Sequence, residues 1–183
     1  TPYARILRGL LEAFEEEGHD VSVFTAQPSY NGVESTKQPE KELLEGVEVN
    51  RITLLGEKKK QFYKRFTNSC YFLARAFVFV FFRRTQCDLI IANVHPPVLM
   101  GCLLRFIRFT TGIPYILHCQ DIHPEAAFHA DILKSKFLQR ILVAIDHKNC
   151  ERAERVVVLS SDMAETLQSR YPDKALQNIE VIN

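Results

Sequence analysis

The stretch "DLIIANVHPPVLMGCLLRFIRFTTGIPYIL", residues 88–117, carries the pattern that decides the fold. An apolar run over 88–92 is followed by a helical stretch over 97–111 and by a second apolar run over 114–117. Gly112 follows the helical stretch, at the position where glycine commonly ends a helix. Strand, helix and strand in this order predict a βαβ unit, in which the two strands lie parallel in one sheet.

The alternation of strands and helices continues on both sides of this unit. The segments expected before it are a helix from Thr1 to Gly18, a strand over 20–25, a long loop over 27–45, a strand over 47–54 and a helix over 67–82. The segments expected after it are a helix over 132–153, a strand over 155–159, a helix over 162–170 and a last strand over 179–182. We therefore predict an α/β fold with a mostly parallel sheet and helices on both of its faces, and residues 1–183 are expected to form one domain or one lobe of a larger protein.

The composition is that of an ordinary globular chain. The hydrophobic fraction is 46%, the charged fraction is 25% and the formal net charge is +1, so no nucleic-acid partner is expected. The five cysteines are widely spaced and include no C-x-x-C pair. This spacing argues against a zinc ribbon and against a secreted disulfide framework, and we expect a cytoplasmic protein.

Polar residues follow the expected strands. In an open parallel sheet, ligands bind beyond the carboxyl ends of the strands, where helix N-termini also point. The stretches found there are "AQPSYN" after 21–25, "NVHPP" after 89–92, "HCQDIHPE" after 115–117 and "SSD" after 156–159. The segment His118–Glu125 is therefore expected to be a loop at the ligand-binding edge, with His95 as its neighbour from the adjacent strand.

The histidines and carboxylates of this loop raise the question of a metal site. His118, Asp121 and His123 carry suitable donor atoms, but their H-x-x-D-x-H spacing matches no standard metal motif. We therefore expect no metal. Neighbouring residues of a strand point to opposite faces, so Cys119 is expected in the core when His118 faces the ligand.

Several candidates also have a structural alternative, which the sequence leaves open. His118 either contacts a ligand or is a structural histidine that bonds the backbone. His95 precedes two prolines that fix a turn, and Ser160 stands where a helix N-cap is expected. His147 is expected on the surface of a helix and is not a candidate.

The apolar segment over 66–82 is too short to cross a membrane and is interrupted by Arg75. Basic residues flank it on both sides, and phenylalanines recur along it. Two alternatives remain open: a helix that lies in the surface of an anionic membrane, and an unusually hydrophobic core helix that covers the sheet. The residues expected to contact the membrane in the first alternative are Lys59, Lys60, Arg65, Phe77, Phe81 and Arg84.

The order of these features resembles the N-terminal, acceptor-binding half of a GT-B glycosyltransferase of the glycosyltransferase 4 family. The stretches that carry the resemblance are "GHDVSVFTAQPSY", "CDLIIANVHPPVLMG", "GIPYILHCQDIHPE", "ERAERVVVLSSDM" and "IEVIN". They are collinear and cover most of the chain. The third stretch is similar to the QD-x-x-PE subgroup of bacterial surface-polysaccharide transferases, although His123 stands where related sequences often carry a tryptophan.

The resemblance implies one Rossmann-like half of a GT-B fold and transfer of a sugar, with retention at the anomeric carbon, from a nucleotide-sugar donor. It implies no catalytic metal and no other cofactor. His118 matches the family histidine that touches the transferring sugar, and Asp121 is the second catalytic candidate. The candidates for substrate binding are Tyr30, His95, Gln120, Glu125 and Ser160.

The acceptors implied by the subgroup are lipid-linked sugars or polysaccharides of the bacterial cell surface, which agrees with a peripheral protein at the inner leaflet of the cytoplasmic membrane. The first strand of the family and its C-terminal donor-binding domain are absent from the sequence, so this fragment is not expected to be active alone. Two alternatives stay open, a GT-B sugar-nucleotide epimerase and a non-catalytic domain of the same fold that binds a glycan or a partner.

Overall fold

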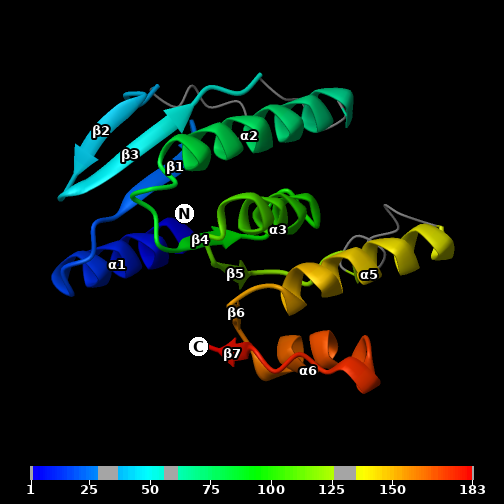
Figure 1. Cartoon of the computed structure of the whole chain (residues 1–183). Coiled ribbons are helices and arrows are strands. Elements are labelled where there is room, and N and C mark those ends of the chain that lie inside the picture. The colour runs from blue at the N-terminus through cyan, green and yellow to red at the C-terminus, as the bar shows by residue number, and fades with distance from the viewer. Residues whose placement is uncertain (1, 29–36, 56–61, 126–134, 183) are drawn as a thin grey trace. The chain divides into compact units, whose positions relative to one another are not determined.

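The computed structural model describes residues 2–28, 37–55, 62–125 and 135–182. They form two compact units, of which the first ends at Ala76 and the second begins at Phe77. Figure 1 labels the helices and strands of both. Helix α2, Phe62–Phe82, contributes residues to both units. Each unit is therefore described by itself.

The first unit contains a helix and a small mixed sheet. Its other elements are α1 (Pro2–Glu16), β1 (Ser22–Ala26), β2 (Lys41–Leu44) and β3 (Val47–Ile52). The strand order is β1-β3-β2, with β1 parallel and β2 antiparallel to β3. Gly18 has a φ of 82°, and the N–H of His19 donates to the carbonyl of Phe14 at 2.9 Å, so the chain leaves α1 at this glycine, two residues after the last helical residue, as predicted.

Strand β2 corrects the prediction of one uninterrupted loop over 27–45. Residues 29–36 lie outside the described residues, but Lys41–Leu44 pair with β3 as a hairpin. The turn is made by Glu45 and Gly46, both with positive φ of 51° and 87°, which matches the twist of antiparallel strands. The strand has only four residues and lies among prolines and charged residues, so apolar periodicity does not predict it.

The first half of α2 is tied to its own unit. Asn68 is buried, its Oδ1 accepts from the backbone N–H of Leu55 at 3.0 Å, and its Nδ2 donates to the carbonyl of the same residue at 2.9 Å. The ring of Phe72 lies 5.4 Å from that of Phe24 on β1. This half of α2 therefore behaves as a core helix, the second of the two alternatives that the sequence left open.

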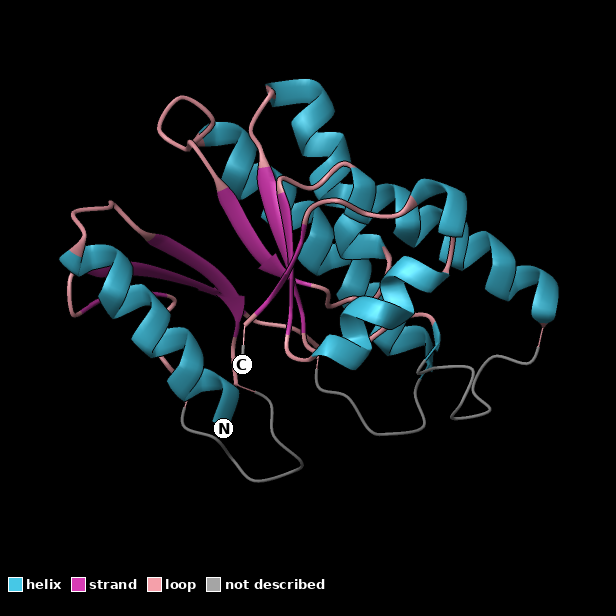
Figure 2. Ribbon diagram, turned by 90° about the horizontal axis from the view of Figure 1, so that it is seen from below, coloured by secondary structure: helices cyan, strands magenta, loops and turns pink. Residues whose placement is uncertain are grey.

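The second unit contains the parallel sheet that the sequence predicts. Its elements are β4 (Ile90–Asn93), α3 (Leu99–Thr111), β5 (Tyr115–Cys119), α5 (Lys136–Glu151), β6 (Arg155–Val158), α6 (Ser161–Ser169), the short helix η1 (Pro172–Lys174) and β7 (Ile179–Val181). The strand order is β4-β5-β6-β7, all pairs are parallel, and helices flank the sheet (Figure 2). The predicted Rossmann-like α/β fold is confirmed.

The core of this unit is centred on β5 and β6. Tyr115, Leu117, Val156 and Val158 are buried almost completely, with exposed fractions of 0 to 1%. Alternate residues of β5 are buried, so Cys119 lies in the core as predicted. The neighbouring strand residue, His118, is only half-buried.

A buried asparagine joins α3 to α5. Asn149 has an exposed fraction of 0%, and its Nδ2 donates to the carbonyl of Val98 at 3.1 Å. Its own carbonyl accepts from the hydroxyl of Tyr115 at 2.7 Å. The side chain also fills the space beside Gly101, where a Cβ would lie 2.6 Å from Nδ2 and 2.8 Å from Cβ of the asparagine. Only glycine allows the two helices to approach this closely.

Gly101→Ala is expected to lower the free energy of unfolding by about 1–3 kcal/mol, because the added methyl group overlaps the buried Asn149. Gly9→Ala is the matched control, since Gly9 lies in α1 with no atom within 4 Å of its added Cβ. There the better helix propensity of alanine should raise stability by about 0.5–1 kcal/mol. Urea unfolding of both variants measures the difference, and equal stability of the two would contradict the packing argument.

Candidate functional site

The centre of the candidate site is the carboxyl end of β5. His118 is paired in register with Asn93 of β4 and with Val157 of β6, so parallel strands hold it on both sides. Burial lowers the pKa of His118 below its usual value. The imidazole is therefore neutral at neutral pH and offers both a donor and an acceptor nitrogen.

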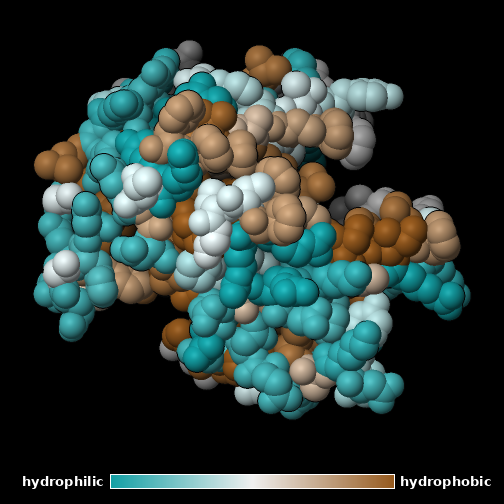
Figure 3. All heavy atoms as spheres, in the orientation of Figure 1, coloured by the Kyte–Doolittle hydropathy of each residue, from teal (hydrophilic) through white to brown (hydrophobic). Residues whose placement is uncertain are grey.

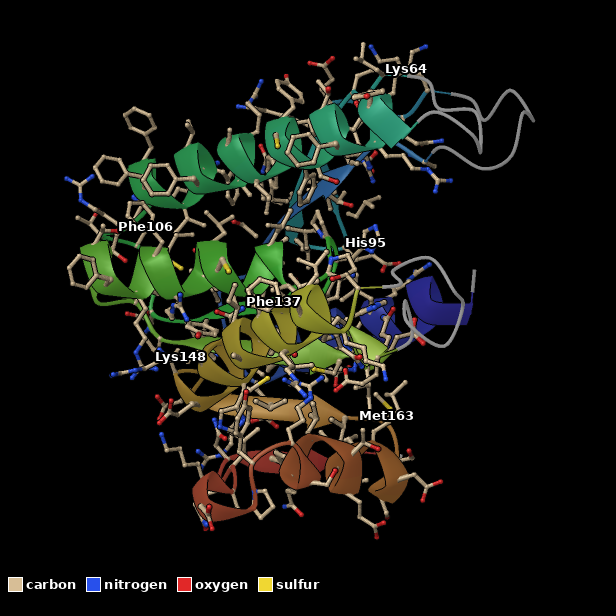
Figure 4. The ribbon with its side chains drawn as sticks, turned by 90° about the vertical axis from the view of Figure 1, so that its right-hand side faces the viewer. Lys64, His95, Phe106, Phe137, Lys148 and Met163 are labelled. Carbon is tan, nitrogen blue, oxygen red and sulfur yellow. The ribbon has the colours of Figure 1, made fainter. Side chains whose placement is uncertain are left out.

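Residues from the neighbouring strand ends lie at the same edge. His95 follows β4 and is exposed, and Met163 belongs to the first turn of α6, which follows β6. In Figure 4 both lie on one side of the second unit, whereas Phe106 and Lys148, near the other ends of α3 and α5, lie on the opposite side. The strand and helix ends that the sequence placed at one edge of the sheet thus lie together, and ligand binding at this edge stays a prediction.

The polar residues directly after β5 differ in burial. Asp121 is exposed at this edge. Gln120 is half-buried, and its buried Nε2 finds no hydrogen-bond partner in the part of the chain that the structure describes. A small cavity of about 10 Å³ lies at this edge. Its lining residues are Val94, Cys119, Asp121, Ile122, His123, Asp146 and Leu167.

Ser160 has the structural role that the sequence left open for it. It is the N-cap of α6, and its Oγ accepts a hydrogen bond from the backbone N–H of Met163 at 3.3 Å. Contact between Ser160 and a substrate stays a prediction.

Glu125 is engaged by a residue that sequence reasoning missed. Arg170, next to the end of α6, donates from Nε and Nη2 to the two carboxylate oxygens of Glu125 at 2.8 and 2.7 Å. Its Nη1 donates to Asp146 Oδ2 at 2.7 Å, and its Nη2 also donates to the carbonyl of His123 at 2.7 Å. The side chain of Arg170 is 3% exposed, so this is a buried ion cluster.

Each charged group of this cluster shifts the pKa of its neighbours. Burial raises the pKa of Asp146, and the nearby Arg170 partly offsets that rise. Burial opposes the charged form of Arg170, yet hydrogen bonds to Glu125 and Asp146 hold its pKa above the usual value. The guanidinium therefore stays protonated in the folded protein.

His147 corrects another prediction. It was expected on a helix surface, but it is 5% exposed, and its ring packs 4.5 Å from that of Tyr171. Helix α5 packs against more than one neighbour, because His147 contacts Tyr171 while Asn149 contacts Val98, and a single apolar stripe in the sequence does not reveal this. Neither ring nitrogen of His147 has a hydrogen-bond partner among the described residues, and burial lowers its pKa.

The remaining candidates divide into those the structure describes and those it does not. Tyr30, Lys59 and Lys60 lie outside the described residues. Arg65 is exposed on α2. Within residues 2–28, 37–55, 62–125 and 135–182, no three histidine, cysteine, aspartate or glutamate side chains are grouped as metal ligands.

The candidate membrane residues at the end of α2 belong to an aromatic cluster. The ring of Phe77 lies 5.6 Å from that of Phe81 and 5.7 Å from that of Phe106 on α3. The guanidinium of Arg84 lies 4.5 Å from the centre of the Phe81 ring. Among the helices that the structure describes, none is long and apolar enough to cross a bilayer.

The parallel sheet with polar side chains at its carboxyl edge defines a Rossmann-like domain of the kind that binds ligands at that edge. A family model described as a glycosyl transferase 4-like domain matches residues 3–182. The chain therefore belongs to the glycosyltransferase 4-like family, and it has the domain of a glycosyltransferase. A search of curated proteins found no match.

His147→Phe is expected to weaken the acid sensitivity of the fold. Because burial lowers the pKa of His147 in the folded protein, the unfolded chain binds its proton first as the pH falls below about 6.5. The free energy of unfolding therefore decreases from that pH downward. Phenylalanine keeps the ring packed on Tyr171 and removes this titration.

Urea unfolding at a series of pH values measures the effect. The variant should lose less stability than the wild type below pH 6.5. Part of the acid sensitivity should remain in the variant, because burial lowers the pKa of His118 as well. Superimposable pH profiles for the two proteins would show that His147 does not titrate as argued.

Proposed function

We propose that the chain is the acceptor-side half of a retaining glycosyltransferase of the QD-x-x-PE subgroup. It transfers a sugar from a nucleotide-sugar donor to a lipid-linked sugar or polysaccharide in the synthesis of bacterial cell-surface glycans. A second, C-terminal domain supplies most of the donor site. The observation that carries this proposal is His118 at the carboxyl end of β5, between two parallel neighbours, in a chain of the glycosyltransferase 4-like family.

The size of the cavity at this edge supports a shared site. Its volume is about 10 Å³, whereas pockets that enclose a small ligand have about 300–1,000 Å³. Within the described residues a sugar would therefore need a second surface to enclose it. In a GT-B enzyme that surface belongs to the donor-binding domain, which closes over the carboxyl edge of this one.

The chemistry assigned to the site needs a neutral histidine. His118 contacts the transferring sugar, either through a hydroxyl group or beside the positive charge that develops at the anomeric carbon. Gln120 and Asp121 orient the acceptor hydroxyl. His95, Tyr30 and Ser160 complete the substrate site, with Glu125 at the end of the loop that carries Gln120 and Asp121. The reaction uses no catalytic metal or other cofactor.

His118→Ala in the complete enzyme is expected to lower kcat for sugar transfer about 100- to 1,000-fold, as the loss of one polar group at a developing charge commonly does. Nucleotide release in the presence of a purified lipid-linked acceptor measures the rate. The fold should persist, because His118 is half-buried on β5 and the core residues beside it are unchanged. His19→Ala, an exposed histidine of the first unit, serves as the control. Wild-type turnover in His118→Ala would exclude this histidine from the reaction.

We also propose that the protein lies on the inner leaflet of the cytoplasmic membrane through the end of α2 and the neighbouring α3. Several large aromatic side chains there are exposed, with 78% for Phe82, 52% for Phe106 and 87% for Phe109. Apolar side chains cover much of α2 in the view of Figure 3. Arg83 and Arg84 stand over the rings of Phe79 and Phe81, an arrangement suited to the boundary between lipid headgroups and acyl chains.

Replacing both Phe82 and Phe109 with serine should reduce binding of the complete enzyme to phosphatidylglycerol vesicles about 10-fold or more. The reason is that burial of each fully inserted ring contributes about 1.5–3 kcal/mol to the binding free energy. Vesicle sedimentation measures the bound fraction. Leu43→Ser on β2, where the leucine is 72% exposed, is the control for loss of an exposed apolar residue. Unchanged binding by the double variant would contradict insertion of these two rings.

A further inference from the structure

Arg170 connects three segments that are far apart in the sequence. It occupies the C-cap position of α6, while its guanidinium reaches Asp146 on α5 and the residues that follow β5. With a side chain 3% exposed, it has no surface to offer to a substrate. Its bonding is directed entirely into the protein.

Two of its contacts hold the far end of the loop that starts at His118. The fork of Nε and Nη2 meets the carboxylate of Glu125 in a bidentate pair, and Nη2 reaches the carbonyl of His123 as well. A planar guanidinium makes such a pair in one orientation, so it fixes direction as well as distance. The loop cannot move at residues 123 and 125 without breaking these bonds.

The near end of the same loop is fixed by β5. His118 pairs with β4 and β6, and Cys119 is buried. Gln120 and Asp121 therefore stand in a short span between two anchors. The strand ladder sets where the span begins, and Arg170 sets where it ends.

We propose that Arg170 is a positioning residue of the acceptor site: it holds the loop so that Gln120 and Asp121 face the acceptor at a fixed offset from His118. This inference rests on the proposed function. It also gives Glu125 a different role, because the carboxylate acts through Arg170 and does not touch the acceptor itself.

The test compares Arg170→Lys, Glu125→Gln and the double variant in the complete enzyme. Lysine keeps the charge but cannot form the bidentate pair. Each single variant should lower kcat/KM for the acceptor about 10- to 100-fold, the size of effect expected from a displacement near 1 Å, while KM for the nucleotide sugar stays as in the wild type. The double variant should lose no more than the worse single variant, since the change at Arg170 already removes the pair that the change at Glu125 breaks.

Two control variants separate positioning from stability. Arg155→Lys alters an arginine whose pair with Glu180 is about half exposed, and it should leave all kinetic constants unchanged. Tyr115→Phe removes the buried hydrogen bond to the Asn149 carbonyl, away from the loop. It should lower the thermal midpoint and leave KM for the acceptor unchanged.

Hydrogen exchange supplies a readout that does not depend on catalysis. The backbone amides of residues 120–123 and of Glu125 should exchange faster in Arg170→Lys and in Glu125→Gln, and at the wild-type rate in Arg155→Lys. If the wild-type enzyme transfers no sugar, the proposed function fails. Unchanged exchange in both variants would show, independently of catalysis, that Arg170 does not fix the loop.

Two kinetic outcomes overturn the inference while leaving the proposed function in place. One is a wild-type kcat/KM for the acceptor in both single variants. The other is additive losses in the double variant, which would mean that Glu125 contacts the acceptor independently of Arg170. Should Arg170→Lys fail to fold, Glu125→Gln alone decides between faster exchange with an acceptor-specific loss and no change.

Discussion

The ladder of β5 is the constraint on which the second unit and its candidate site depend. A strand paired on both sides has its register fixed, and a shift by one residue would turn every side chain to the other face. Tyr115, Leu117 and Cys119 could not leave the core without exposing apolar surface. The apolar residues therefore place His118, whose half-burial and neutral imidazole follow from their packing.

The ion cluster around Arg170 is difficult to explain by stability alone. Removing two carboxylates and a guanidinium from water costs several kcal/mol per ion, and hydrophobic replacements of buried ion pairs are often neutral or stabilising. A hydrophobic cluster, however, makes no directional hydrogen bonds. The bidentate pair with Glu125 and the bond to the His123 carbonyl fix a loop end in one orientation, which the proposed positioning of Gln120 and Asp121 requires.

The sequence predicted what local patterns encode. Period-two alternation separated Cys119 from His118, and a glycine stop ended α1. The bond between Arg170 and Glu125 joins residues 45 positions apart, and no local pattern announces it. His147 was misplaced because α5 contacts neighbours on more than one side, and periodicity identifies only the strongest apolar face. Interactions that depend on tertiary pairing are those that a single sequence hides.

Helix α2 shows why composition could not decide between a core helix and a membrane helix. Phenylalanine is favourable both in a protein core and in a membrane interface, so the aromatic content of the segment does not distinguish the two environments. The polar residues of the helix do distinguish them. Asn68 is buried because the backbone of Leu55 satisfies its amide, which marks the first half as part of a core. At the other end Arg84 and Phe82 are exposed and Arg84 lies over the ring of Phe81, so this end is not part of a buried core. Its contact with a membrane surface stays a proposal.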